Sequence, residues 1–272
     1  MLPVEQSTLR IGLCQLTSGE VPADNIEAIR AGVARAAGQG ARVVVFPEAA
    51  MARFGVSLKP IAEPLDGPWA KSVSEIAREH DVLVVAGMFT PADDGRVRNT
   101  LLITGLGHHL GYDKIHLYDA FGFRESDTVA PGAEPVTLTV DAVTIGFATC
   151  YDLRFPELFR TLADRGAAAV VVPTSWGAGE GKREQWEVLV RARALDSGCW
   201  VLGCGQADPA ATGVAVNPKA PTGIGHSTVA DGLGRVHAQL GPGPEVVVVQ
   251  VDPAVAERAR GVTGALANRR LG

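Results

Sequence analysis

A single cysteine, Cys150, ends an apolar run and is followed at once by polar residues. The run 143–148 has the composition of a buried strand, and Pro156 with Glu157 suits the first turn of a helix. α/β proteins place their chemistry in the crevice at the carboxyl ends of strands, so a thiol at this junction is a candidate nucleophile. The alternative is a small buried hydrophobic residue, because free cysteine is often buried.

Two further strand ends carry a charge. Glu48 follows the β-branched run 41–46, and Lys114 lies inside the strand-like segment 110–116. Either charge alone is consistent with a surface residue at a strand edge. An acid, an amine and a thiol at three strand ends together predict nucleophilic catalysis. The carboxylate can take the thiol proton, and the ammonium can lower the thiol pKa and then hold an oxyanion.

The elements that must position these residues alternate along the chain. Apolar runs predict strands at 9–16, 41–46, 82–89, 97–104, 110–116, 136–140, 143–149, 167–172, 199–206, 225–230 and 246–251. Helix patterns cover 22–37, 67–80, 155–165 and 182–197. We expect one domain over residues 1–272, with a core from about 9 to 252 and a C-terminal tail from 253 to 272. Two helix layers should cover a sheet core rich in antiparallel or mixed pairs.

Composition narrows the class of protein. Hydrophobic residues make up 46% of the 272 and charged residues 20%, which is typical of a globular protein. The net charge of −5 and the lack of a basic patch argue against nucleic acid, and no segment suggests a membrane. Four cysteines do not indicate a disulfide framework, and residues 1–10 lack the apolar core of a secretory signal. We therefore expect a cytoplasmic protein.

Two other classes of function have weaker support. Cys199 and Cys204 with His226 or His237 are not spaced as paired zinc ligands, so we expect no metal. The segment 177–182 mimics a phosphate loop but lacks its first glycine and its magnesium-binding hydroxyl, which argues against a nucleotide-binding module. A thiol redox or scaffold protein is a third hypothesis, against which the absence of a C-x-x-C motif argues.

Three motifs, taken together, resemble those of the nitrilase superfamily of carbon–nitrogen hydrolases. They are, in family order, Phe46-Pro47-Glu48, Asp113-Lys114-Ile115-His116-Leu117-Tyr118 and Cys150-Tyr151-Asp152-Leu153-Arg154-Phe155-Pro156-Glu157. Lesser matches lie at 123–126, 173–176, 186–196, 225–227 and 266–270. The resemblance implies an α/β fold built as a four-layer α-β-β-α sandwich, a layer order that the strand pattern alone does not define.

The resemblance also implies a role for each site residue. It makes Cys150 the nucleophile, Glu48 the general base and Lys114 the oxyanion stabiliser. The backbone N–H of Tyr151 would be the second oxyanion donor, and Glu125 an auxiliary acid near the lysine. Attack on an amide would release ammonia and leave a thioester, which water then hydrolyses. This chemistry requires no metal or organic cofactor.

The third motif is most similar to that of ω-amidases and deaminated-glutathione amidases. This implies a small linear amide, an ω-amide of a dicarboxylic acid; an N-carbamoyl compound or a nitrile is the alternative substrate. We expect Arg154, Thr174 and Tyr118 to contact the substrate. Arg154 either holds the remote carboxylate of the substrate or pairs with a buried acid such as Asp152 or Glu157.

The family usually pairs its protomers through the helices that flank the nucleophile. The equivalent helices here are 155–165 and 182–197. We expect a homodimer or an even multiple of one, with Phe159 and Leu162 partly at the interface. Loops 119–124 and 206–224 should shape the substrate pocket, and their sequences do not name the natural amide.

Overall fold

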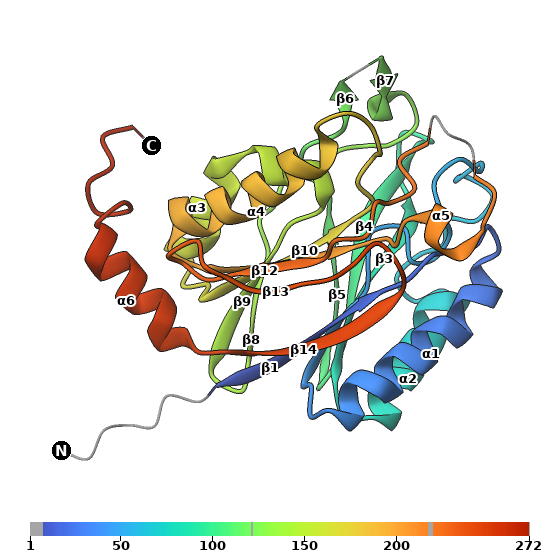
Figure 1. Cartoon of the computed structure of the whole chain (residues 1–272). Coiled ribbons are helices and arrows are strands. Elements are labelled where there is room, and N and C mark those ends of the chain that lie inside the picture. The colour runs from blue at the N-terminus through green and yellow to red at the C-terminus, as the bar shows by residue number, and fades with distance from the viewer. Residues whose placement is uncertain (1–7, 121, 217–219, 272) are drawn as a thin grey trace.

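Two six-stranded sheets pack face to face, and each carries helices on its outer face, as Figure 1 shows for the computed structural model. The structure describes residues 8–120, 122–216 and 220–271. The layers run helix, sheet, sheet, helix. The predicted four-layer α-β-β-α sandwich is therefore confirmed.

The first sheet has the strand order β14-β1-β2-β3-β4-β5. Its strands are β1 (Leu9–Gln15), β2 (Val43–Val45), β3 (Leu83–Pro91), β4 (Val97–Gly105), β5 (His108–Asp113) and β14 (Glu245–Val251). Strands β1, β2 and β3 are parallel, and the outer pairs are antiparallel. Helices α1 (Pro22–Gly38) and α2 (Pro68–Glu79) cover this sheet.

The second sheet repeats this plan in the order β13-β12-β11-β10-β9-β8. Its strands are β8 (Thr137–Val140), β9 (Val143–Phe147), β10 (Ala169–Thr174), β11 (Trp200–Gly205), β12 (Thr228–Ala230) and β13 (Val236–Gln239). Strands β9, β10 and β11 are parallel, and the others pair antiparallel. Helices α3 (Pro156–Asp164) and α4 (Lys182–Ser197) cover it.

The main core lies between the sheets, where β-branched and leucine side chains from both sheets interdigitate. Two further apolar clusters join each sheet to its helices. Strands of the central parallel pairs are buried on both faces, which explains why β2 and β10 have continuous apolar sequences rather than alternating ones. Such rigid strands fix the residues at their carboxyl ends.

Smaller elements complete the chain. They are the ribbon β6 (Asp119–Ala120) and β7 (Phe123–Arg124), the 3-10 turns η1 (Glu125–Asp127) and η2 (Cys150–Arg154), and helices α5 (Pro209–Thr212) and α6 (Pro253–Thr263). Helix α6 lies within the segment expected to be a tail. The sequence analysis also missed β13, because the strand is exposed and lacks an apolar run.

Two predictions about position are wrong. The strand expected to contain Lys114 ends at Asp113, one residue before the lysine. Lys114 therefore lies outside the sheet and lines the cavity. Phe159 and Leu162 do not lie at a surface, because both side chains are fully buried within the protomer. Leu162 packs directly over Gly146 of β9, where even a Cβ atom would lie 3.0 Å from it.

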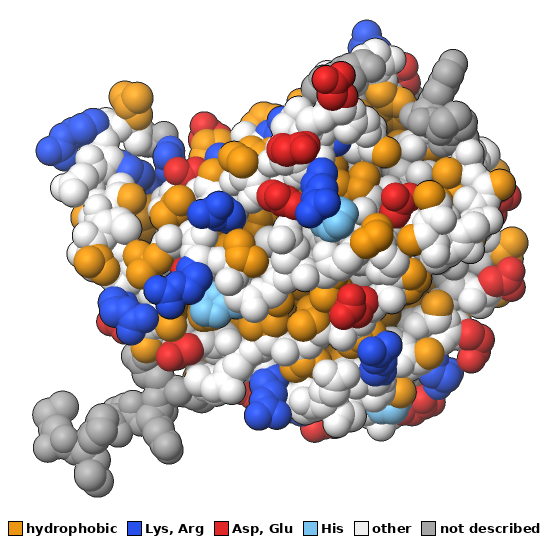
Figure 2. Space-filling model, viewed as in Figure 1, with side chains coloured by type: hydrophobic (Ala, Val, Ile, Leu, Met, Phe, Trp, Pro, Cys, Tyr) orange, Lys and Arg blue, Asp and Glu red, His pale blue; other side chains and the backbone are white. Residues whose placement is uncertain are grey.

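Within the described ranges, none of the helices combines the length and the apolar character that crossing a membrane requires. On the face that Figure 2 shows, acidic and basic side chains are interspersed rather than gathered by sign.

Candidate active site

The three predicted catalytic residues meet at one cavity. Glu48 comes from the turn after β2, Lys114 from the end of β5, and Cys150 from the start of η2 after β9. Glu48 and Lys114 are 1% and 2% exposed, and Cys150 is 9% exposed. The two sheets thus contribute opposite sides of the site at the carboxyl ends of their parallel strands.

The Lys114 ammonium lies between two buried carboxylates. Its Nζ is 3.1 Å from Glu48 Oε1 and 2.9 Å from Glu125 Oε2. Burial alone would lower the pKa of Lys114, but the negative charges of Glu125 and Glu48 outweigh it and raise that pKa well above its usual value. The two carboxylates therefore favour the charged form of the lysine.

Asn99 and Ser175, which the sequence analysis missed, hold the carboxylates in place. Asn99 Nδ2 donates to Glu48 Oε1 at 2.8 Å and to Glu125 Oε1 at 3.3 Å. The Ser175 backbone N–H donates to Glu48 Oε2 at 2.8 Å. With Lys114, these donors leave Glu48 little freedom to rotate. Asn99 lies in β4 between Arg98 and Thr100, so its own strand gave no signal that singled it out.

Glu48 is also fixed from its backbone. The next residue, Ala49, has a φ of +59°, a left-handed conformation that is costly for a residue with a Cβ atom. Gln206 Nε2, from the other sheet, donates to the Glu48 carbonyl at 3.0 Å. Gly87 of β3 lies so close that a Cβ there would be 2.5 Å from the Ala49 nitrogen. Tight packing on both sides maintains the strained turn.

Cys150 occupies a strained turn of its own. Its φ is +47°, and its Sγ lies 3.8 Å from the Ser175 carbonyl oxygen. Burial raises the pKa of the thiol well above its usual value, the charge of Glu48 raises it further, and Lys114 opposes both. The expected lowering by the lysine is therefore present but too small to prevail. The surroundings of Cys150 therefore favour the thiol over the thiolate.

Asp152 ties the nucleophile turn to the strand that precedes Lys114. Its fully buried carboxylate accepts from Tyr112 Oη at 2.6 Å, the Thr149 N–H at 2.8 Å and the His116 N–H at 2.9 Å. His116 Nδ1 lies 2.7 Å from the same carboxylate. The His116 ring stacks on Phe155 with centroids 3.7 Å apart. Asp152 is thus committed to this network and not to Arg154.

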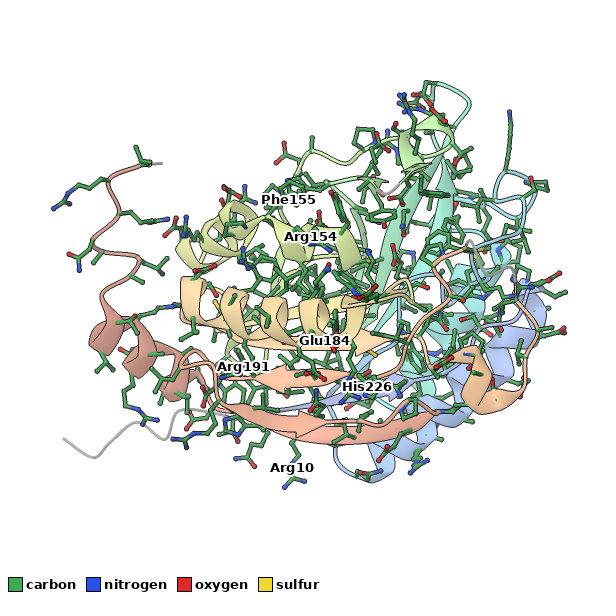
Figure 3. All side chains as sticks on the ribbon, turned by 45° about the horizontal axis from the view of Figure 1, so that its top comes forward. Arg10, Arg154, Phe155, Glu184, Arg191 and His226 are labelled. Carbon is green, nitrogen blue, oxygen red and sulfur yellow. The ribbon has the colours of Figure 1, made fainter. Side chains whose placement is uncertain are left out.

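Arg154 lines the cavity without a carboxylate partner among the described residues. Its Nη2 donates to Gln185 Oε1 of α4 at 2.7 Å, and its guanidinium carbon is 5.3 Å from the centre of the Trp176 ring. Its Nε is buried and has no hydrogen-bond partner in the described part of the chain. Figure 3 shows Arg154 at the start of the α3 segment, above α4.

The remaining wall of the cavity is largely aromatic. Tyr118 lines it, with its ring edge-on to Tyr151 at 5.1 Å between centroids. Phe123 and Pro221 come from the two loops expected to shape the pocket; residues 121 and 217–219 of those loops lie outside the described residues. The cavity has a volume of about 60 Å³. That is room for on the order of five water-sized groups, which suits a short acyl chain.

Thr174 does not reach the cavity, contrary to prediction. Its hydroxyl donates to the Val172 carbonyl at 3.0 Å and the residue is fully buried, whereas the adjacent Ser175 lines the cavity. Side chains alternate along an extended chain, so the residue that faces the cavity lies one position after the predicted one.

The cysteines and histidines considered as metal ligands lie apart from the site. Cys204 Sγ donates to the Val45 carbonyl at 3.2 Å, and His237 Nε2 lies 2.7 Å from Asp231. In the part of the chain that the structure describes, no three His, Cys, Asp or Glu side chains are grouped so that they could hold a metal ion.

A buried thiol therefore lies beside a carboxylate and an ammonium at the edge of an α-β-β-α sandwich. A sequence model of the carbon–nitrogen hydrolase family matches residues 10–261. The chain belongs to this family, within the nitrilase superfamily.

Individual relatives agree with this assignment. Hydrolase Rv0480c of Mycobacterium tuberculosis is 51% identical over 96% of this chain and 95% of its own length. The mouse omega-amidase NIT2 is 32% identical over 90% of this chain and 89% of its own, and the deaminated glutathione amidase of Escherichia coli is 31% identical over 91% and 92%.

Solved structures support the same family assignment. Nit3 of Saccharomyces cerevisiae, a member of branch 10 of the nitrilase superfamily, superposes with a TM-score of 0.82 at 25% identity, covering 97% of each chain. An amidase of Nesterenkonia sp. AN1 superposes with a TM-score of 0.79 at 25% identity, covering 96% of each chain. In that structure acrylamide has added to the active-site cysteine.

Proposed function

We propose that the protein is an amidase that hydrolyses a small linear amide through a thioester at Cys150. The observation that carries this proposal is the convergence of Glu48, Lys114 and Cys150 on one small cavity. The amidases among its relatives support the same reaction class.

The first half-reaction forms the thioester. Cys150 Sγ attacks the amide carbon while Glu48 takes its proton, because the thiol is too weak an acid to ionise unaided. The oxyanion is held by Lys114 Nζ and the Tyr151 backbone N–H. Glu48 then gives the proton to the nitrogen, the carbon–nitrogen bond breaks, and ammonia leaves.

The second half-reaction releases the acid. A water molecule gives a proton to Glu48 and attacks the thioester carbon, with the oxyanion in the same place. The carbon–sulfur bond breaks, the sulfur recovers the proton, and the carboxylic acid departs. Glu125 and Asn99 do not exchange protons in this scheme; they keep Lys114 and Glu48 aligned.

The substrate class follows from Arg154. A guanidinium at the cavity wall, whose buried Nε has no hydrogen-bond partner among the described residues, is suited to a carboxylate, which it can bind in a bidentate manner. The natural substrate is therefore an ω-amide of a dicarboxylic acid, with the carboxylate on Arg154 and the amide carbon over Cys150.

The test is to trap the acyl-enzyme. Amides, carbamoyl compounds and nitriles of matched length are mixed with the enzyme, and each reaction is quenched. The mass of the Cys150 peptide is then measured by mass spectrometry. An acyl adduct with ammonia release supports the amidase; a carbamoyl adduct alone points to an N-carbamoyl hydrolase.

Cys150→Ala should remove turnover while the circular dichroism spectrum stays unchanged. We expect activity to fall to less than about one hundredth of wild type, since the loss of a nucleophile costs more than that. Cys199→Ala, which removes a buried thiol far from the cavity, is the matched control. Retained activity in Cys150→Ala would contradict the covalent mechanism.

A further inference from the structure

Gln185, at the start of α4, contacts the guanidinium of Arg154 at the cavity wall. We infer that Gln185 is a positioning residue that determines specificity. Because its side chain is neutral, it orients Arg154 without cancelling the positive charge, and the enzyme therefore prefers amides that end in a carboxylate. This inference rests on the proposed amidase function. It adds a residue that does not itself line the cavity but on which the preference for an anionic substrate depends.

Arg154 is held by one hydrogen bond and two aromatic rings. Its Nη2 donates to Gln185 Oε1 at 2.7 Å. Its guanidinium carbon lies 5.3 Å from the centre of the Trp176 ring and 5.9 Å from the centre of the Tyr151 ring. Its buried Nε has no hydrogen-bond partner among the described residues. The guanidinium is therefore positioned by groups that carry no negative charge.

Acidic residues flank Gln185 on α4 but are directed elsewhere. Glu184 is exposed and lies below α4 in the view of Figure 3, whereas Arg154 lies above the helix. Glu187 Oε1 accepts a hydrogen bond from Gln239 Nε2 of β13 at 2.9 Å. The start of the helix thus has a neutral side chain at the position that contacts Arg154 and an acidic one on either side of it.

Stability alone would favour glutamate at position 185. The residue is the fourth of α4, near the end of the helix where the dipole favours a negative side chain. A carboxylate there would also pair with the half-buried guanidinium of Arg154, and a charged acceptor binds it more strongly than an amide does. Glutamate and glutamine have nearly the same shape, so packing does not explain glutamine. The neutral side chain forgoes this stabilisation and leaves the charge of Arg154 for a ligand.

The carboxylates of the cavity are engaged by another cation. Among the described residues that line it, they are Glu48 and Glu125, and both contact Lys114. A substrate carboxylate therefore meets a guanidinium that none of the described lining carboxylates contacts. With glutamate at position 185, the guanidinium would already be paired. The substrate would then compete with a carboxylate that the protein holds at a high effective concentration.

The experiment uses Gln185→Glu and two amides of the same length, one ending in a carboxylate and one in a neutral group. The ratio of kcat/KM for the carboxylate amide to that for the neutral amide should fall at least about tenfold, mainly through KM. The melting temperature should rise by about 2–4 °C, the scale of one added charge pair. The double variant Glu184→Gln/Gln185→Glu exchanges the two side chains at constant net charge and should show the same loss of preference.

Glu184→Gln alone is the matched control, because the exposed Glu184 side chain lies outside the cavity lining. It should leave the ratio unchanged. An unchanged ratio, equal losses for both amides, or a lowered melting temperature in Gln185→Glu would overturn the inference. Failure of the amidase proposal would instead be seen in the wild-type enzyme, as the absence of ammonia release from every amide.

Discussion

Cys150 keeps its proton in the free enzyme because burial and the charge of Glu48 raise its pKa, and Lys114 cannot offset both. Many cysteine enzymes work from a preformed thiolate, which requires a lowered pKa. In the proposed mechanism the proton leaves only as the sulfur attacks. The carboxylate that disfavours the thiolate would then also be the base that makes the attack possible.

The raised pKa of Cys150 should change how its alkylation rate depends on pH. Only the thiolate reacts, and below the pKa its fraction grows about tenfold per pH unit. Since the pKa is raised, the iodoacetamide rate should be slow at pH 7 and still rising at pH 9, where an ordinary thiol levels off. Peptide mapping separates Cys150 from the other three cysteines. A plateau below pH 8 would show a preformed thiolate instead.

Arg154→Lys tests recognition of a single carboxylate. Lysine keeps the positive charge but lacks the planar guanidinium that binds a carboxylate through two hydrogen bonds. For an amide with a remote carboxylate, kcat/KM should therefore fall by an amount that corresponds to about 2–4 kcal/mol. A neutral amide of the same length should lose much less. Arg183→Lys, on an exposed arginine that pairs with Glu187, is the control. Equal losses for both amides would make Arg154 a structural residue.

At the scale of elements, Glu48 and Cys150 each follow a buried strand at a turn with a positive φ, at Ala49 and at Cys150 itself. The Glu48–Ala49 turn is pressed between Gly87 of β3 and Gln206 beyond β11. The Cys150 turn is held by Asp152 through four contacts. Strain at the two turns is thus balanced by contacts within the protein.

Gly87→Ala should expose this dependence. The added methyl group would lie 2.8 Å from the Glu48 Cα, so the turn must move and the base with it. A displacement near 1 Å can cost about a hundredfold in rate, and we expect kcat to fall on that scale. Gly38→Ala, at the end of α1 with no atom within 4 Å of the new methyl, is the control and should leave kcat unchanged. Unchanged kcat in Gly87→Ala would show that the turn can relax.

The sequence alone predicted strands and helices, because their patterns are local. It did not predict the contacts between residues that lie far apart in the chain. The strands leading to Glu48 and Cys150 carry continuous apolar runs, and both were expected close to their observed bounds. Asn99 is separated from Glu48 by 51 residues, and nothing in its own strand indicates which carboxylate it holds. The sequence analysis named Thr174, whereas the adjacent Ser175 lines the cavity. The sequence at the end of β10 does not indicate which of the two side chains faces the cavity.

At the scale of the whole molecule, α4 connects the site to the surface. Its inner face buries Trp186, Val190 and Ala194, while Val188 and Leu195 are 62% and 42% exposed. These two are seven residues apart and share one stripe of the helix with Arg191, which Figure 3 labels. Exposed apolar side chains in a stripe indicate an interface more than scattered ones do.

We therefore predict a homodimer formed through the outer face of α4 rather than through Phe159 and Leu162. Light scattering at micromolar concentration should give twice the chain mass of 28.4 kDa. Leu195→Lys should shift the mass toward the monomer, because an unpaired ammonium would be buried at the contact. Val262→Lys, on the 70% exposed side chain of α6, should leave the mass unchanged. A monomer in the wild type, or a dimer that Leu195→Lys leaves intact, would contradict this interface. Since Gln185 of α4 also holds Arg154, loss of the dimer should weaken carboxylate binding as well.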